Sequence, residues 1–136
     1  MDKALNYMSL ARKAGIIELG EEPVGGAARA LKAKLVIVAA DSGDHTWRRA
    51  KSFVAGTDQV CVRVPYSKDE MGQATGRTSL AIAAFTDPAM ALSFVKALPQ
   101  PPQDAVEALL AKTQKQKQLK KEAQAHKKNV RFGKKK

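Results

Sequence analysis

The unbroken apolar run KLVIVAAD, residues 34–41, constrains the fold of this chain more than any other segment. Its hydrophobic residues do not alternate with polar ones, and most of them are β-branched or small. This pattern is typical of a short strand that is covered on both faces. Such a strand needs helices above and below it, so the run predicts a sheet in the middle of a layered α/β fold.

Helix start and stop signals surround this strand throughout residues 1–98. Asp2 is suited to cap a first helix that ends at Gly15, and Pro23 suits the first turn of a second helix. The remaining signals are Asp44 and Gly56 around a third helix, Ser67 and Glu70 at capping-box spacing with Gly76 ending a fourth, and Asp87 with Pro88 starting a fifth.

Three further apolar stretches are short enough to be strands. They are GIIELG (15–20), QVCVRVP (59–65) and SLAIAAF (79–85). Helices and strands therefore alternate along the chain, which predicts a single three-layer α/β/α sandwich.

A composition break divides the chain at ALPQPPQDAV, where three prolines fall within four positions. Residues 1–98 carry 13 basic and 10 acidic side chains, a net charge of +3. Residues 99–136 carry 11 basic and 3 acidic side chains, a net charge of +8. We therefore expect a folded domain over 1–98 and a Pro-bounded, Lys- and Gln-rich basic tail over 99–136.

The tail has strong helix formers but only a thin apolar stripe, Leu109, Leu110 and Leu119. It is expected to be partly helical or disordered when free and helical when bound. Lysines spaced among glutamines favour many phosphate contacts without base selectivity, although a merely solubilising extension is the alternative. The expected phosphate contacts are Lys115, Lys117, Lys120, Lys121, Lys127, Lys128 and Arg131.

The formal net charge of +11 predicts a polyanionic partner, nucleic acid more readily than an anionic membrane surface. Cys61 is the single cysteine, so no internal disulfide forms and a reducing compartment is expected. Charged residues near the start exclude an ordinary signal peptide, and no segment reaches the roughly 20 apolar residues that span a bilayer. A cytoplasmic protein without a membrane partner is predicted.

Enzyme chemistry has little support in the sequence. His45 and His126 lie far apart, and neither has a partner at a recognised catalytic or metal-ligand spacing. The turn GEEPVGG does not match a nucleotide-binding motif, and adjacent acids such as Glu21 and Glu22 more often complement a helix dipole than form an acid/base pair. The prediction is a binding protein with no metal and no cofactor.

The second helix and one loop are better candidates for a binding surface. Gly25 and Gly26 interrupt a helix at a cost of about 1 kcal/mol each, which suggests either close approach of RNA or close helix packing. Arg77 lies in the loop GRTS, which suits phosphate contact. Trp47 is expected to be a core or edge residue, and a base-stacking platform is the alternative. The predicted RNA contacts are Gly20, Glu21, Glu22, Gly25, Gly26, Arg29, Arg77, Thr78 and Ser79.

The motifs LARKAG, GEE ahead of KAKLVIVAAD, and VPYSKDEMGQATG followed by LAIAAF occur in this order and spacing. In these motifs residues 1–98 resemble the ribosomal L-seven-Ae family of kink-turn RNA binders, most closely its small bacterial YlxQ-type members. The resemblance implies a mixed four-stranded sheet. It also implies an RNA face made by the start of the second helix, residues 20–26, and the loop before the last strand, residues 76–79.

Three positions depart from the family's G-x-N-E-x-x-K pattern. Glu22 stands in place of Asn, Pro23 in place of Glu and Gly26 in place of Lys. The resemblance therefore predicts an RNA-binding accessory protein associated with the ribosome, with weakened kink-turn recognition. The alternative is a protein-interaction module that kept the fold and lost the RNA face.

Overall fold

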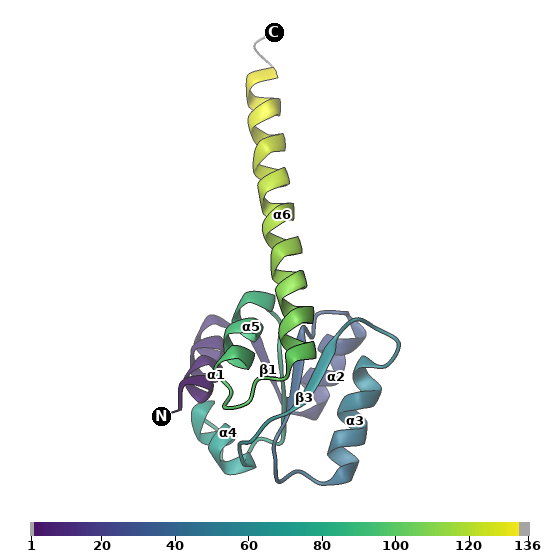
Figure 1. The fold of residues 1–136 in the computed structure, drawn as a ribbon, viewed down its shortest axis with the longest axis vertical. Coiled ribbons are helices and arrows are strands. Elements are labelled where there is room, and N and C mark those ends of the chain that lie inside the picture. Colours follow the sequence, from purple (N-terminus) through teal and green to yellow (C-terminus); the bar gives the residue numbers. More distant parts are fainter. Residues whose placement is uncertain (1, 134–136) are drawn as a thin grey trace.

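The computed structural model describes the backbone of residues 2–133 and the side chains of residues 2–119. Helices and strands alternate as far as the fifth helix, and a sixth, longer helix follows (Figure 1). The elements are α1 (Lys3–Ala14), β1 (Ile17–Leu19), α2 (Glu21–Arg29), β2 (Leu35–Val38), α3 (Asp44–Val54), β3 (Val60–Arg63), α4 (Lys68–Ala74), β4 (Ile82–Phe85), α5 (Pro88–Lys96) and α6 (Gln103–Gly133).

The four strands form one mixed sheet in the order β1-β4-β2-β3. β2 and β3 are parallel, whereas β4 is antiparallel to both of its neighbours, β1 and β2. One row crosses the whole sheet, because Arg63 is opposite Val38, Val38 is opposite Ile82, and the Gly20 amide donates to the Ile82 carbonyl oxygen. This row marks the end of the sheet where β1, β2 and β3 finish and β4 begins.

Helices cover both faces of the sheet, which confirms the predicted sandwich. One core contains residues of α1, α4, α5 and the start of α6 against Leu35 and Ile37 of β2. The other contains residues of α2 and α3 against Val36 and Val38 of the same strand. All four β2 residues are fully buried, as expected for an apolar run that packs on both sides.

Several helix ends form where the sequence places them. Gly15 ends α1 in the left-handed conformation with φ of 71°, and Ser67 and Glu70 form a reciprocal capping box at α4. Asp2 caps α1 by accepting from the Ala4 amide, and its carboxylate also accepts from the buried Tyr66 hydroxyl at 2.8 Å. The Tyr66 bond lowers the pKa of Asp2. Burial raises the pKa of Tyr66, and so does its bond to Asp2.

The packed core extends beyond residue 98, the predicted end of the folded domain. Ala105, Leu109 and Thr113 of α6 are buried, and the first two belong to the α1/α5 core. Lys112 forms an ion pair with Asp58 at 3.0 Å. The buried residues recur every four positions, so one helical stripe attaches α6 to the domain.

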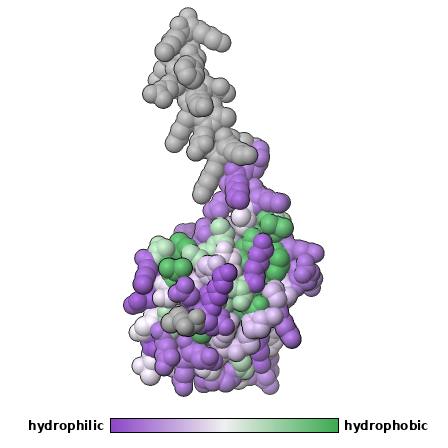
Figure 2. Space-filling model, turned by 60° about the vertical axis from the view of Figure 1, so that its left-hand side comes forward, coloured by the Kyte–Doolittle hydropathy of each residue, from purple (hydrophilic) through white to green (hydrophobic). Residues whose placement is uncertain are grey.

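Beyond this attachment α6 projects away from the domain (Figure 1). Its 31 residues correspond to a helix about 46 Å long. Apolar side chains gather near the base of α6, while hydrophilic side chains cover most of the rest of the face in Figure 2.

Candidate nucleic-acid interface

The two regions that the resemblance implies lie next to each other at one end of the sheet. β1 runs directly into Gly20 and α2, and β4 is preceded by residues 76–79. Gly20 has φ of 98°, a conformation that favours glycine, and its amide donates to Ile82 at 3.0 Å. Arg77 Nη1 lies 3.7 Å from the point where a Cβ of Gly20 would stand. The start of α2 and the loop therefore form one continuous surface.

Gly72 of α4 packs against the backbone of this loop. A Cβ at Gly72 would lie 2.8 Å from the Arg77 carbonyl oxygen and 2.9 Å from the Ser79 amide nitrogen. The Arg77 amide donates to the Gly72 carbonyl at 2.8 Å, and Gly76 turns the chain with φ of 75°. The backbone of the loop is thus held against a helix that has no side chain at the contact. Arg77, Thr78 and Ser79 are exposed above it.

Arg12 of α1 is a further residue at this loop that sequence analysis did not single out. Its guanidinium atoms lie 3.2 to 3.4 Å from the position of a Cβ on Gly76. Arg12 and Arg77 are both exposed, and within residues 2–119 neither has a carboxylate within ion-pair distance. Arg12 therefore places one uncompensated guanidinium group at the Gly76 turn, and Arg77, the next residue, places a second one beside Gly20. The motif LARKAG was the only sequence signal for Arg12.

The start of α2 carries the opposite charge. Glu21 forms an ion pair with Arg49 of α3 at 2.7 Å, and both side chains are about half exposed. Glu22 is also exposed. Both acids occupy the first turn, where negative charge complements the helix dipole. The Glu21 charge is therefore partly neutralised, whereas Glu22 forms no ion pair within residues 2–119 and remains a negative group in the first turn of α2.

The two adjacent glycines of α2 have different environments. Gly25 is buried, and a Cβ there would lie 3.1 Å from the Phe53 ring and 3.3 Å from Arg29 Nη1. Gly26 is exposed, with no atom within 4 Å of a Cβ built on it. Close packing of α2 on α3 thus accounts for Gly25, whose missing side chain leaves room for the Phe53 ring. Gly26 faces open space.

A shallow groove of about 360 Å³ runs between α2 and α3, beside this site. Arg29 and Phe53 line it together with the Glu21–Arg49 pair, and the Arg49 guanidinium lies 5.4 Å from the Phe53 ring centre. Arg29 is therefore separated from the loop that carries Arg77 by the first turns of α2. The predicted contacts divide into a loop group and a groove group.

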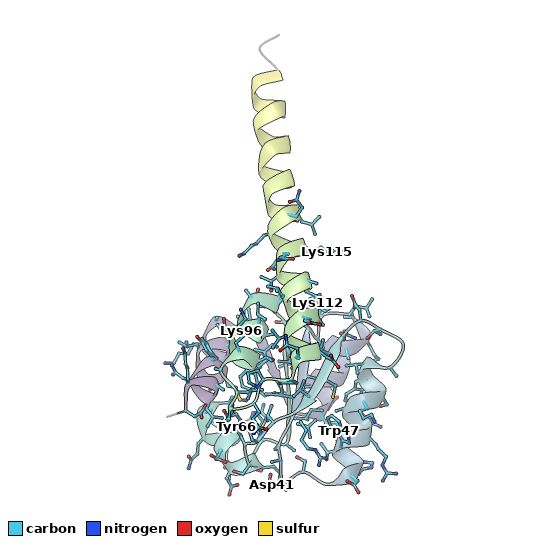
Figure 3. All side chains as sticks on the ribbon, in the orientation of Figure 1. Asp41, Trp47, Tyr66, Lys96, Lys112 and Lys115 are labelled. Carbon is cyan, nitrogen blue, oxygen red and sulfur yellow. The ribbon has the colours of Figure 1, made fainter. Side chains whose placement is uncertain are left out.

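The basic tail extends from the other end of the sheet. The predicted contacts Lys115 and Lys117 are exposed, and Lys115 lies just beyond the attachment at Lys112. In Figure 3 Lys112 and Lys115 lie on the side of the domain from which α6 projects, and Asp41, which follows β2, lies at the opposite end. The side chains of Lys120, Lys121, Lys127, Lys128 and Arg131 lie outside the described residues.

Residues 2–119 contain no group of three or more metal-ligating side chains. No described helix is long and apolar enough to cross a membrane. Burial raises the pKa of the Cys61 thiol to about 11, so this thiol stays protonated and is a poor nucleophile at neutral pH.

Comparison with known proteins gives the fold. No protein-family model and no curated protein matches the chain. A solved structure of a protein of unknown function from Bacillus halodurans is 22% identical, with a TM-score of 0.67 over 74% of this chain and 100% of that one. The 15.5kD RNA binding protein of Giardia lamblia is 21% identical, with a TM-score of 0.60 over 79% of this chain and 87% of that one. This chain therefore shares its fold with an RNA-binding protein.

Proposed function

We propose that this protein is a non-enzymatic, cytoplasmic RNA-binding accessory protein that docks structured RNA at the end of the sheet. The observation that carries the proposal is that one loop is bordered by two exposed arginines, with the Arg12 guanidinium at the Gly76 turn and the Arg77 guanidinium beside Gly20, where α2 starts. Two guanidinium groups without acidic partners favour phosphate, which Arg binds in bidentate geometry. The fold shared with the Giardia lamblia RNA binding protein supports RNA as the ligand.

The backbone adds to this proposed contact. The first amides of a helix have no partners within the helix, and they favour an anion together with the helix dipole. Thr78 and Ser79 supply neutral hydroxyl donors beside Arg77. Contacts of this kind position RNA without reading its bases. The tail is proposed to add affinity that does not depend on sequence.

Ribosomal RNA is the proposed class of ligand, in keeping with the resemblance to the L-seven-Ae family. Glu22, Pro23 and Gly26 do not supply the groups that read a kink-turn in that family. Glu22 also places a negative charge in the first turn of α2, where the family's pattern has a neutral Asn. Docking is therefore proposed to depend on backbone contacts more than on recognition of the sheared guanines of a kink-turn.

A protein-interaction module is the second candidate. The specific observation in its favour is the acidic start of α2, where Glu21 is already engaged with Arg49 and Glu22 opposes phosphate. In this alternative the sheet end contacts a polar protein surface through Arg12 and Arg77, and RNA binds the tail alone.

The test compares arginines inside and outside the site in the full-length protein. Arg12→Ala and Arg77→Ala should each weaken binding of a kink-turn stem, and of the same stem with a plain internal loop, by roughly fivefold or more, since each removes a charge-assisted contact worth about 1 kcal/mol. Arg48→Ala is the matched control, because Arg48 is exposed on α3 and reaches only the Asp44 carbonyl. Equal affinities for all three variants would support the protein-interaction module instead.

A further inference from the structure

Trp47 is the only tryptophan of the chain, and it lies at the outer edge of the α2/α3 core. The ring is half-buried, so one part packs on the core and another part reaches the surface. Two cations approach it: the Arg63 guanidinium carbon lies 5.2 Å from the ring centre and Lys51 Nζ lies 5.8 Å from it. Figure 3 shows Trp47 on the side of the molecule formed by α3.

These two cations are not neutralised. Arg63 and Lys51 are exposed, and within residues 2–119 neither has a carboxylate within ion-pair distance. Arg49, also on α3, differs because Glu21 compensates its charge. The aromatic ring and two free positive charges therefore form a compact patch, which we call the Trp47 platform: Trp47, Lys51 and Arg63.

The sheet register places the platform in line with the loop site. Arg63 is opposite Val38, which is opposite Ile82, and Ile82 accepts from the Gly20 amide. Three strand spacings separate the Arg63 and Gly20 backbones, a distance of about 14 Å. Val38 and Ile82 belong to the α2/α3 core, so α3 covers the Arg63 side of this row and α2 covers the Gly20 side. An extended RNA strand that passes this end of the sheet covers the distance from Gly20 to Arg63 within a few nucleotides.

We propose that the Trp47 platform is a second RNA contact that binds a single-stranded segment. A base stacks against the exposed part of the Trp47–Arg63 pair, and Lys51 and Arg63 bind the adjoining phosphates. Aromatic rings and arginine planes both stack nucleobases, and nearby cations bind the backbone. A duplex does not fit this role, because its bases are already stacked on each other. The positive charge of the platform is complementary to RNA and disfavours a cationic protein partner.

The single tryptophan supplies a direct test in the full-length protein. A single-stranded RNA of about ten nucleotides should quench Trp47 fluorescence as it binds. A duplex of matched length and an abasic strand of the same length should bind through phosphate contacts, the tail included, with little quenching. The projecting part of α6 leaves the domain at the opposite end of the sheet. RNA bound only to that part is therefore not expected to contact Trp47.

Three variants distinguish RNA binding by the platform from binding by the loop site and from a general effect of positive charge. Arg63→Ala should weaken single-strand binding by roughly fivefold, whereas Arg48→Ala removes the same charge from outside the platform and should change it less than twofold. Even where Arg77→Ala raises the RNA concentration needed for quenching, the quenching at saturating single-stranded RNA should persist, so the platform is tested separately from the proposed function. Circular-dichroism melting of each variant checks the fold. The proposal would be wrong if single-stranded RNA bound without quenching Trp47 fluorescence. It would also be wrong if Arg63→Ala and Arg48→Ala weakened single-strand binding equally.

Discussion

The sheet end and the basic tail concentrate positive charge in opposite ways. At the sheet end, Arg12 and Arg77 come from distant segments. The loop that contains Arg77 is held by the turn at Gly76 and by its backbone contact with Gly72 of α4. In the tail, the sequence carries a net charge of +8 over residues 99–136, and the backbone of Gln103–Gly133 forms a single helix. The first arrangement fixes the geometry of a few contacts, whereas the second multiplies contacts without fixing their geometry. Selectivity for the shape of an RNA, not for its bases, is therefore expected at the sheet end, and salt-dependent affinity is expected in the tail.

Their separation across the sheet has a further consequence. α6 runs from the segment beside Arg63 toward Lys112 and Asp58, so its projecting part leaves at the end remote from Gly20. One RNA that contacts both regions must extend along the domain. Short RNAs should thus occupy one region at a time.

Weakening the contact between α6 and the domain should have the largest effect on stability. Leu109 is fully buried in the α1/α5 core, so Leu109→Ala should lower the free energy of unfolding by about 2–5 kcal/mol. Leu119→Ala is the matched control, because Leu119 is 57% exposed and its truncation should be nearly neutral. Urea unfolding of both variants measures the difference. Equal stabilities would mean that α6 is an independent appendage from its first residue.

Removing the tail beyond its attachment should have the next largest effect. Deletion of residues 120–136 removes eight basic side chains and one acidic one and leaves the buried stripe of α6 in place. RNA affinity at low salt should fall by roughly 30-fold or more, and the slope of log affinity against log salt should decrease by about 0.7–0.9 for each phosphate that the shortened protein no longer binds. The ratio of affinities between structured RNAs should stay unchanged. An unaltered salt slope would show that this part of the tail does not contact RNA.

A third change affects only the sheet end. Gly72→Ala places a Cβ against the loop backbone at 2.8 Å, so the loop must move. We expect stability to fall by about 1–3 kcal/mol and the Arg77 contact to weaken, with the salt dependence from the tail retained. Gly43→Ala is a suitable control, since a Cβ there meets nothing within 4 Å. RNA binding that survives Gly72→Ala unchanged would argue against a preorganised loop.

The sequence predicted the regular parts of this fold because local signals decide them. The Asp2 cap, the Gly15 stop and the Ser67–Glu70 capping box all depend on residues within one turn of each other. The apolar run of β2 likewise predicts its own burial.

The missed features depend on contacts between distant segments. Gly25 and Gly26 are identical in sequence terms, and only the position of Phe53 distinguishes a packed glycine from an open one. Arg12 meets Gly76 only after the chain has folded. The buried stripe on α6, which includes Leu109, was concealed by the Lys- and Gln-rich composition around it.

The different environments of Gly25 and Gly26 predict smaller changes in stability, which differ between the two positions. Gly26→Ala should stabilise the protein by up to about 1 kcal/mol through helix propensity, and Gly25→Ala should gain less or lose stability, because its Cβ crowds Phe53. Gly26→Lys adds a positive charge beside Glu22 and should also raise kink-turn affinity relative to Gly26→Ala. Thermal melting and gel-shift titration measure the two effects. A lower melting temperature for Gly26→Ala than for Gly25→Ala would contradict this account of α2.

The smallest expected effect lies where α6 meets the domain, at the ion pair of Asp58 with Lys112. The hydrogen bond and charge of Lys112 lower the pKa of Asp58 below its ordinary value of 3.8, so the pair stabilises the folded state above that pH. Asp58 is 90% exposed, which limits the contribution to less than about 1 kcal/mol and makes it sensitive to salt.

Asp58→Asn should therefore reduce stability slightly at neutral pH. The difference from the unmodified protein should shrink as the pH falls through the lowered pKa, because the native carboxylate then becomes protonated and also loses its charge. Urea unfolding at neutral pH and near pH 3, each at low and high salt, measures this convergence. A difference that grows on acidification would mean that Asp58 acts through its packing or hydrogen bonding, and that the attachment of the basic helix does not depend on this charge pair.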